Sequence, residues 1–277
     1  MKLPAAITVR DRFAPLRQEL IAVLEGLNEQ DWMRPTAAPA WSVKDVAAHL
    51  LGGDIGILSR ERDGFRFAPV DPSTYRELVE LVNQLNDEWT VAARRISPRL
   101  LCELLTLVGP KVEAYFSTLD LDALGGPVSW AGPDPAPVWF DIAREYTERW
   151  HHQQQIRDAT DRPGLYDPYY FAPVLDTFVR ALPHHFRETA APAGTVVRVE
   201  IAGDAGGVWF LHRTNDRWTL ALEGSLETPA SEVTLAQDTA WRLFTHGIDR
   251  AHARAQAKIR GDANIIEPLF TTLAIIG

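Results

Sequence analysis

The sequence predicts an α+β protein with two parts, a helical part over residues 1–190 and a small α/β domain over residues 195–277. Two observations lead to this prediction. Through the first two thirds of the chain, apolar residues recur every three or four positions, which is the period of an amphipathic helix. Beyond residue 195, short apolar runs alternate with polar residues, which is the period of a strand. Pro192 and Gly194 mark a linker between the two parts.

The helical part is divided by residues that start or break helices. Ser42 can cap the helix that follows it, because its hydroxyl can accept a bond from the backbone three residues on, and Asp45 adds a negative charge to the first turn. Ser97-Pro98 opens another helix, and the breakers from Gly125 to Pro137 predict a loop. The expected helices cover residues 9–28, 42–62, 71–92, 97–119, 138–160 and 168–188.

The second part begins with strands that are short and rich in β-branched or aromatic residues. Four are expected, at residues 195–201, 207–212, 217–222 and 231–235. Asp238 then caps a helix whose Leu243 and Phe244 point inward, and residues 265–275 are expected to form a closing helix. The order of strands followed by helices gives this part an α/β character of its own.

Composition and charge exclude several classes of protein. With 46% hydrophobic and 23% charged residues, the chain is an ordinary globular protein. A net charge of −9 without any basic block argues against a nucleic-acid partner. We find no apolar segment long enough for a membrane span or typical of a signal peptide, so we expect a soluble, cytoplasmic protein. Cys102 alone cannot form an internal disulfide or a cysteine-based zinc cluster, and it lies in an apolar run that predicts core.

Glu148 and His152 are the first candidates for a metal site. Their Glu-x3-His spacing places both side chains one turn apart on one helix face, within reach of one ion. Since the chain has 8 histidines and 37 acidic residues, such a pair is also expected by chance, and Asp45 with His49 makes a second. Ile156 marks the face of Glu148 and His152 as buried, where a carboxylate and an imidazole need partners. A metal is one solution, and a buried ion pair is the other.

The helical phase separates His152 from its neighbour His151, which points away from Ile156. On the helix that begins at Ser42, His49 is the matching candidate. If the two helices lie side by side, His49, Glu148 and His152 form a set of two imidazoles and one carboxylate. Such a set leaves coordination positions open, which is the arrangement of a catalytic metal site.

The neighbourhood of His49 is unusual in its glycines. A glycine inside a helix costs roughly 1 kcal/mol relative to alanine. Three follow His49 on its own side: Gly52, Gly53 and Gly56. They indicate a close approach to the backbone, either by a bound ligand or by a tightly packed helix. Trp41 is expected to pack at the start of this helix, and Trp150 either fills the core or forms a wall of the site.

The two segments that carry these residues resemble the mycothiol-dependent maleylpyruvate isomerase family of the DinB/YfiT-like superfamily. They read WSVKDVAAHL at residues 41–50 and ERWHH at residues 148–152. The pattern W-[ST]-x3-V-x2-H joined to E-x3-H is fairly specific for the superfamily, though not for one substrate. The resemblance extends over the whole chain: the helical part is similar to a DinB-like four-helix bundle, and the tail to a small sterol-carrier-like α/β domain.

The resemblance implies roles for particular residues. His49, Glu148 and His152 match the three metal ligands of the family, with zinc the usual ion. Nickel and other divalent ions would fit the same atoms. At Gln155 the chain departs from the family, because many relatives have aspartate there, followed by Ile-Arg as in Ile156-Arg157. The change affects support for His152 or a contact to the thiol cofactor.

Further candidates follow for the remainder of the site. Gly53, Gln155 and Arg157 are candidates for binding a thiol cofactor. The family also uses a basic residue from its C-terminal domain at the active site, for which Arg242 and Arg250 are the candidates.

The function that these features predict is that of a metal-dependent isomerase or S-transferase. The metal would bind a low-molecular-weight thiol, mycothiol in the family, and favour the thiolate, which is the nucleophilic form. The thiolate would then attack a small electrophilic substrate. The alternative is a non-catalytic metal-binding or sensor protein of the same fold, to which the change at Gln155 gives weight. The sequence leaves the substrate and the oligomeric state open.

Overall fold

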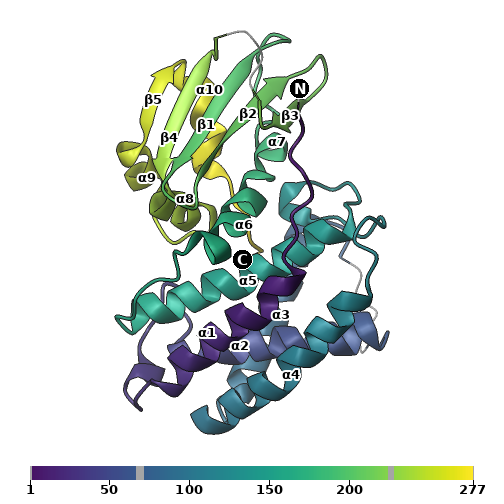
Figure 1. Cartoon of the computed structure of the whole chain (residues 1–277), viewed down its shortest axis with the longest axis vertical. Helices are drawn as coiled ribbons and strands as arrows, with labels where there is room; N and C mark the ends of the chain where they lie inside the picture. Colours follow the sequence, from purple (N-terminus) through teal and green to yellow (C-terminus); the bar gives the residue numbers. More distant parts are fainter. Residues whose placement is uncertain (1, 67–71, 224–227, 277) are drawn as a thin grey trace. The chain divides into compact units, whose positions relative to one another are not determined.

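The computed structural model describes residues 2–66, 72–223 and 228–276 (Figure 1). The chain forms two compact units. The bundle unit consists mainly of Val9–Leu121 and Glu145–Leu165, and the sheet unit consists of Met1–Thr8, Asp122–Arg144 and Tyr166–Ile275. This mixture of helices and one sheet confirms the predicted α+β class.

The compact units do not divide at the expected linker of residues 190–194. The helical segment 166–190 groups with the sheet unit, and its Phe178 ring lies 6.1 Å from that of Phe244, between centroids. The independent folding of residues 1–190 and 195–277 stays a prediction.

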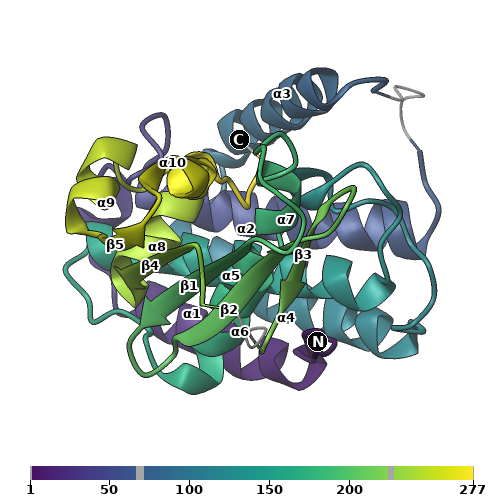
Figure 2. The same cartoon turned by 90° about the horizontal axis from the view of Figure 1, so that it is seen from above.

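In the described part of the chain, five long helices lie wholly or mostly in the bundle unit, and the first residues of α5 group with the sheet unit. Figure 2 shows these helices from above. They are α1 (Phe13–Glu25), α2 (Val43–Gly56), α3 (Tyr75–Ala93), α4 (Pro98–Thr118) and α5 (Val138–Ala159). A π-helical segment, Ile57–Arg62, extends α2. The expected helix over residues 42–62 is therefore present, and its last six residues are π-helical. Helix α3 starts after Thr74, whose side chain caps it, while the expected start at Asp71 lies outside the described residues.

The start of α2 is fixed by a capping box. Ser42 accepts a hydrogen bond from the backbone N–H of Asp45, and the Asp45 carboxylate accepts one from the backbone N–H of Ser42. These two bonds satisfy donors that the first helical turn leaves free. Behind the cap, α2 buries an apolar side against α1, α4 and α5, which includes Val46, Ala47, Leu51, Leu101, Leu105 and Ile156. The cap and this core together set the direction in which His49 leaves the helix.

The sheet unit contains five strands in the order β3-β2-β1-β4-β5. They are β1 (Val196–Ala202), β2 (Gly207–Arg213), β3 (Trp218–Ala221), β4 (Ser231–Ala236) and β5 (Lys258–Gly261). Strands β1 and β4 are parallel, and the other neighbours are antiparallel. Val197, Val199 and Ile201 are buried on one face, whereas Arg198 and Glu200 alternate onto the other and form an ion pair.

The helices of the sheet unit differ from expectation near the C-terminus. The structure has α6 (Pro168–Val179), α7 (Leu182–His185), α8 (Gln237–Phe244), α9 (Arg250–Gln256) and α10 (Ala263–Ile266). Strand β5 and helix α9 were not predicted. The expected closing helix over residues 265–275 is wrong: α10 gives way to a 3-10 segment, Glu267–Thr271, and no helix follows it. Across the described residues, none of the helices combines the length and apolar character that a bilayer crossing requires.

Two adjacent glycines of α2 have different surroundings. A Cβ on Gly52 would lie 2.5 Å from Nε1 of Trp89 on α3, and this nitrogen donates a 2.7 Å hydrogen bond to the Ala48 carbonyl. A Cβ on Gly53 would meet no atom within 4 Å. Of the two explanations for these glycines, tight helix packing therefore applies to Gly52.

We expect opposite effects from substituting these two glycines. Gly53→Ala should raise the free energy of unfolding by up to about 1 kcal/mol, because alanine favours the helix and meets no neighbour. Gly52→Ala should lower it by about 1–3 kcal/mol, because the indole of Trp89 must move. Thermal and urea unfolding of both variants measure the difference, and a stabilised Gly52→Ala would contradict this account of the α2–α3 contact.

Candidate metal centre

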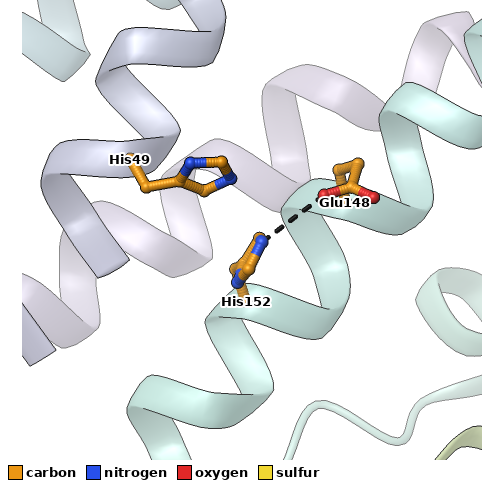
Figure 3. A group of neighbouring side chains, drawn as sticks. All are labelled: His49, Glu148 and His152. Atoms are coloured by element: carbon orange, nitrogen blue, oxygen red, sulfur yellow. Dashed lines mark ion pairs between the residues drawn. The ribbon is translucent and has the colours of Figure 1, made fainter. Parts of the chain in front are cut away.

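Three side chains from α2 and α5 come together inside the bundle unit (Figure 3). His49, Glu148 and His152 each offer one ligand atom, and these atoms lie within 4.8 Å of one another. Nε2 of His152 lies 3.4 Å from Oε2 of Glu148. We refer to these three residues as the donor cluster.

The i, i+4 spacing on α5 explains why Glu148 and His152 lie close together. Glu148 and His152 stand one turn apart on the same face. His49 reaches them from α2, with its ring centroid 4.6 Å from that of His152. Asp45, which has the same spacing from His49, does not join the cluster, because its carboxylate caps α2 and binds Arg94.

Gln155 orients His152. Its side-chain oxygen lies 2.9 Å from Nδ1 of His152. Since this oxygen can only accept a hydrogen bond, Nδ1 carries the proton in this arrangement. The lone pair of the neutral imidazole is then on Nε2, the atom that faces Glu148. The amide therefore holds the tautomer that a metal ligand needs.

The environment keeps the donor cluster in the protonation states that metals require. Burial, followed by the neighbouring His152, lowers the pKa of His49 to about 3. Burial by itself raises the pKa of Glu148, but its contact with Nε2 of His152 and the adjacent His151 and His49 outweigh burial and hold this pKa below its usual range. At neutral pH, His49 is an uncharged donor and Glu148 a carboxylate.

This donor set fits a divalent ion such as zinc. Zinc takes imidazole nitrogen and carboxylate oxygen at about 2.0–2.2 Å, so two tetrahedral ligands lie a little over 3 Å apart. The 3.4 Å between Glu148 and His152 agrees with that separation. The Glu148 carboxylate is a buried anion beside two imidazoles, and a bound cation would give its charge a partner.

Of the two tryptophans considered from the sequence, Trp41 lies beside the donor cluster. The ring of Trp41 lies 4.8 Å from that of His49 and 6.2 Å from that of His152, between centroids. The sequence had suggested Trp41 as a helix staple and left Trp150 as core or site wall. The structure places Trp150 fully in the core, where its indole N–H donates to the Leu165 carbonyl, so Trp41 is the residue that covers the cluster.

His151 is buried too, although it is not one of the three residues of the donor cluster. Its Nδ1 lies 3.1 Å from the Thr147 carbonyl, and its ring centroid is 3.9 Å from that of His152. Burial, followed by the proximity of His152, lowers its pKa to about 3. His151 therefore packs against His152 and is not one of the residues whose ligand atoms form the donor cluster.

Next to the cluster, Arg149 is held by two acidic side chains. It donates to Oδ1 of Asp54 on α2 at 2.5 Å and to Oε2 of Glu145 at 2.7 Å. Burial lowers the pKa of Arg149, but the two carboxylates outweigh this and raise it above its usual value. This ion triad joins α2 to α5 one turn from the donor cluster.

The other candidate site residues have different positions. Gly53 lies one turn after His49 beside open space. Arg157 is buried and donates hydrogen bonds to the Pro163 carbonyl and to Glu19. These contacts hold α5 to α1 and to the segment that follows α5. Arg242 and Arg250 belong to the sheet unit. Arg242 pairs with Asp238 and lies over the Trp241 ring, and Arg250 is the exposed first residue of α9. Their part in the reaction stays a prediction.

We expect Gln155 to tune metal affinity. Gln155→Leu removes the acceptor for Nδ1 of His152 and should weaken metal binding about 10–100-fold, as with other residues that orient metal-binding histidines. Gln155→Glu restores an acceptor and should bind at least as tightly as the natural chain. Competition with a chromophoric chelator measures both constants, and equal affinity in Gln155→Leu and the natural chain would contradict this role.

The fold and the donor cluster define a class: a helical bundle with a candidate divalent-metal centre, joined to a mixed α/β unit. Comparison with known families makes this definition specific. The family model described as the mycothiol maleylpyruvate isomerase N-terminal domain matches residues 13–157, which is more than half of the chain and includes the entire donor cluster. The chain belongs to this family.

Solved structures agree on the fold. Similar structures include that of the mycothiol-dependent maleylpyruvate isomerase and that of a histidine-to-alanine variant of it. In each case the TM-score is 0.53 and the identity is 9%, over 88% of this chain and 91% of the other. At this identity the similarity establishes the shared fold. A comparison with curated protein sequences finds no match.

Proposed function

We propose that the protein is a metal-dependent enzyme that uses a low-molecular-weight thiol, mycothiol in the first instance, to isomerise or conjugate a small electrophilic substrate. The family and the shared fold support the thiol and the reaction class. The observation that carries the proposal is the donor cluster, in which two imidazoles and one carboxylate converge within 4.8 Å.

In this proposal His49, Glu148 and His152 hold one divalent ion, zinc by preference and nickel as an alternative. When bound, such an ion lowers the pKa of a coordinated thiol from about 8.5 and makes thiolate available at neutral pH. Three protein ligands leave at least one coordination position open, which a catalytic site requires.

The surrounding residues prepare the centre for this chemistry. Gln155 keeps the proton of His152 on Nδ1, so Nε2 remains a donor. The carboxylate of Glu148 would reduce the charge of the centre by one, and the ring of Trp41 lies against that of His49. The open space beside Gly53, one turn from His49, gives room for the body of a thiol or its substrate.

The test is isomerisation of maleylpyruvate by the metal-loaded protein with and without mycothiol. We expect turnover that requires both metal and thiol and that disappears in His152→Ala. In the cobalt-substituted protein, adding mycothiol should produce a thiolate-to-cobalt absorption band. No effect of millimolar thiol on the cobalt spectrum would contradict the proposal.

The second candidate is a metal-binding or sensor protein without turnover. The neutral amide of Gln155, where the resemblance implies aspartate, favours this alternative. It predicts metal binding and a thiol-induced cobalt band but no conversion of maleylpyruvate or other electrophiles. If Gln155→Asp creates turnover that the natural chain lacks, this alternative holds.

A further inference from the structure

The bundle unit has a hollow at the start of α2 that the proposed reaction does not use. Its volume is about 460 Å³, within the range of small-molecule sites. Its lining combines apolar and polar residues. The apolar ones are Met33, Pro35, Pro39, Ala40 and Trp41, and the polar ones are Ser42, Lys44, Asp45 and Arg94.

Two cations that line the hollow, Lys44 and Arg94, have hydrogen-bond donors that are not used within the described part of the protein. Lys44 donates from Nζ to the Arg94 carbonyl at 2.8 Å, and within the described residues its two other N–H groups have no partner. Arg94 donates through Nε and Nη2 to Asp45, and in the same part of the chain its Nη1 has none. Both cations therefore retain donors for a ligand.

The charge of the lining favours an anion. Asp45 is the one acidic residue that lines the hollow, against two cations. Its carboxylate is occupied, since it accepts bonds from the Ser42 backbone, the Ser42 hydroxyl and Arg94. In a chain of net charge −9, a surface hollow with an excess of positive charge is a local exception that attracts anions.

Trp41 supplies a flat surface to the same hollow. Its ring is half-buried, and the residues beside it, Pro35 and Pro39, are rigid. A planar body stacked on the indole would share the hollow with the two cations, because Trp41, Lys44 and Arg94 all line it. The Trp41 ring also lies 4.8 Å from that of His49, between centroids. A ligand in the hollow would therefore contact a side chain that packs against the donor cluster.

We propose that this hollow is a binding site for a small carboxylate with a planar apolar body, which stacks on Trp41 and pairs its carboxylate with Lys44 and Arg94. This site is separate from the donor cluster and does not require the metal, so it goes beyond the proposed function.

The test uses benzoate as the probe and benzamide as its neutral counterpart. The indole N–H signal of Trp41, assigned from its absence in Trp41→Phe, is followed by NMR during titration of the full chain. Benzoate should shift this signal saturably, and benzamide should bind about tenfold more weakly, because it cannot form charge-assisted bonds. No saturable shift with benzoate at tens of millimolar would overturn the proposal.

A matched pair of lysine variants tests whether Lys44 binds the carboxylate. Lys44→Gln should weaken benzoate binding about tenfold and leave benzamide unchanged, whereas Lys111→Gln, at an exposed position of α4, should change neither. Unchanged benzoate affinity in Lys44→Gln would overturn the assignment.

A further comparison separates this site from the metal. Benzoate affinity should be the same for the protein as purified and after removal of metal by a chelator. Binding that requires metal and disappears in His152→Ala would mean that the carboxylate coordinates the ion, and the hollow would not be the site. Failure of the thiol chemistry would leave the benzoate result unaffected.

Discussion

His152→Ala is expected to abolish stoichiometric binding of a divalent ion, whereas the natural chain should hold about one ion per molecule. The ligand atom that is lost, Nε2, lies 3.4 Å from Glu148 and faces the centre of the donor cluster. The two ligands that remain do not complete a zinc site. Elemental analysis after dialysis against trace metal gives the ratio of ion to protein.

His151→Asn is the matched control. The asparagine amide can replace the Nδ1 donor that faces the Thr147 carbonyl, and His151 supplies no atom to the donor cluster. Metal content should therefore stay near that of the natural chain. An equal loss of metal in both variants would mean that the ligand assignment on α5 is wrong.

The largest loss of stability is expected from Arg149→Met. This substitution leaves Asp54 and Glu145 facing each other without the guanidinium that now lies between them. Removing one partner of a buried ion pair costs about 3–5 kcal/mol, because the charge left behind is buried without compensation. Urea unfolding measures the change in the free energy of unfolding.

Arg99→Met is the control for the loss of an arginine as such. Arg99 is also paired, with Glu103 one turn later on α4, but its side chain is 91% exposed. An exposed pair of this kind contributes about 0.3–0.5 kcal/mol. If Arg149→Met is no more destabilising than Arg99→Met, the triad of Arg149, Asp54 and Glu145 does not hold α2 to α5.

Sequence periodicity located most of the elements, and the failures have physical reasons. Strand β5 (Lys258–Gly261) is an edge strand that lies mostly exposed, so it lacks the alternating pattern of a half-buried strand and exists through pairing with β4. The expected closing helix was wrong because of Pro268, which lacks the N–H that an α-helix needs and clashes with the preceding turn.

The site was predictable within one helix but not between helices. The spacing of Glu148 and His152 can be read from the chain, whereas the approach of His49 depends on how α2 packs against α5, for which the family resemblance was needed. The burial of His151 could not be inferred from the position of Ile156, because every residue from Trp150 to Arg157 is buried. A helix enclosed on all sides has no polar face that reveals its orientation.

The position of Cys102 has a consequence under the proposed function. It is the one cysteine of the chain, and it is buried on α4 in the bundle core. Burial raises the pKa of its thiol, and the nearby Glu25 raises it further, so little thiolate forms at neutral pH. An electrophilic substrate of the proposed reaction would therefore meet no reactive thiol on the folded protein. The proposed enzyme would then resist alkylation of its own cysteine by that substrate, and Cys102 would form no mixed disulfide with a thiol cofactor.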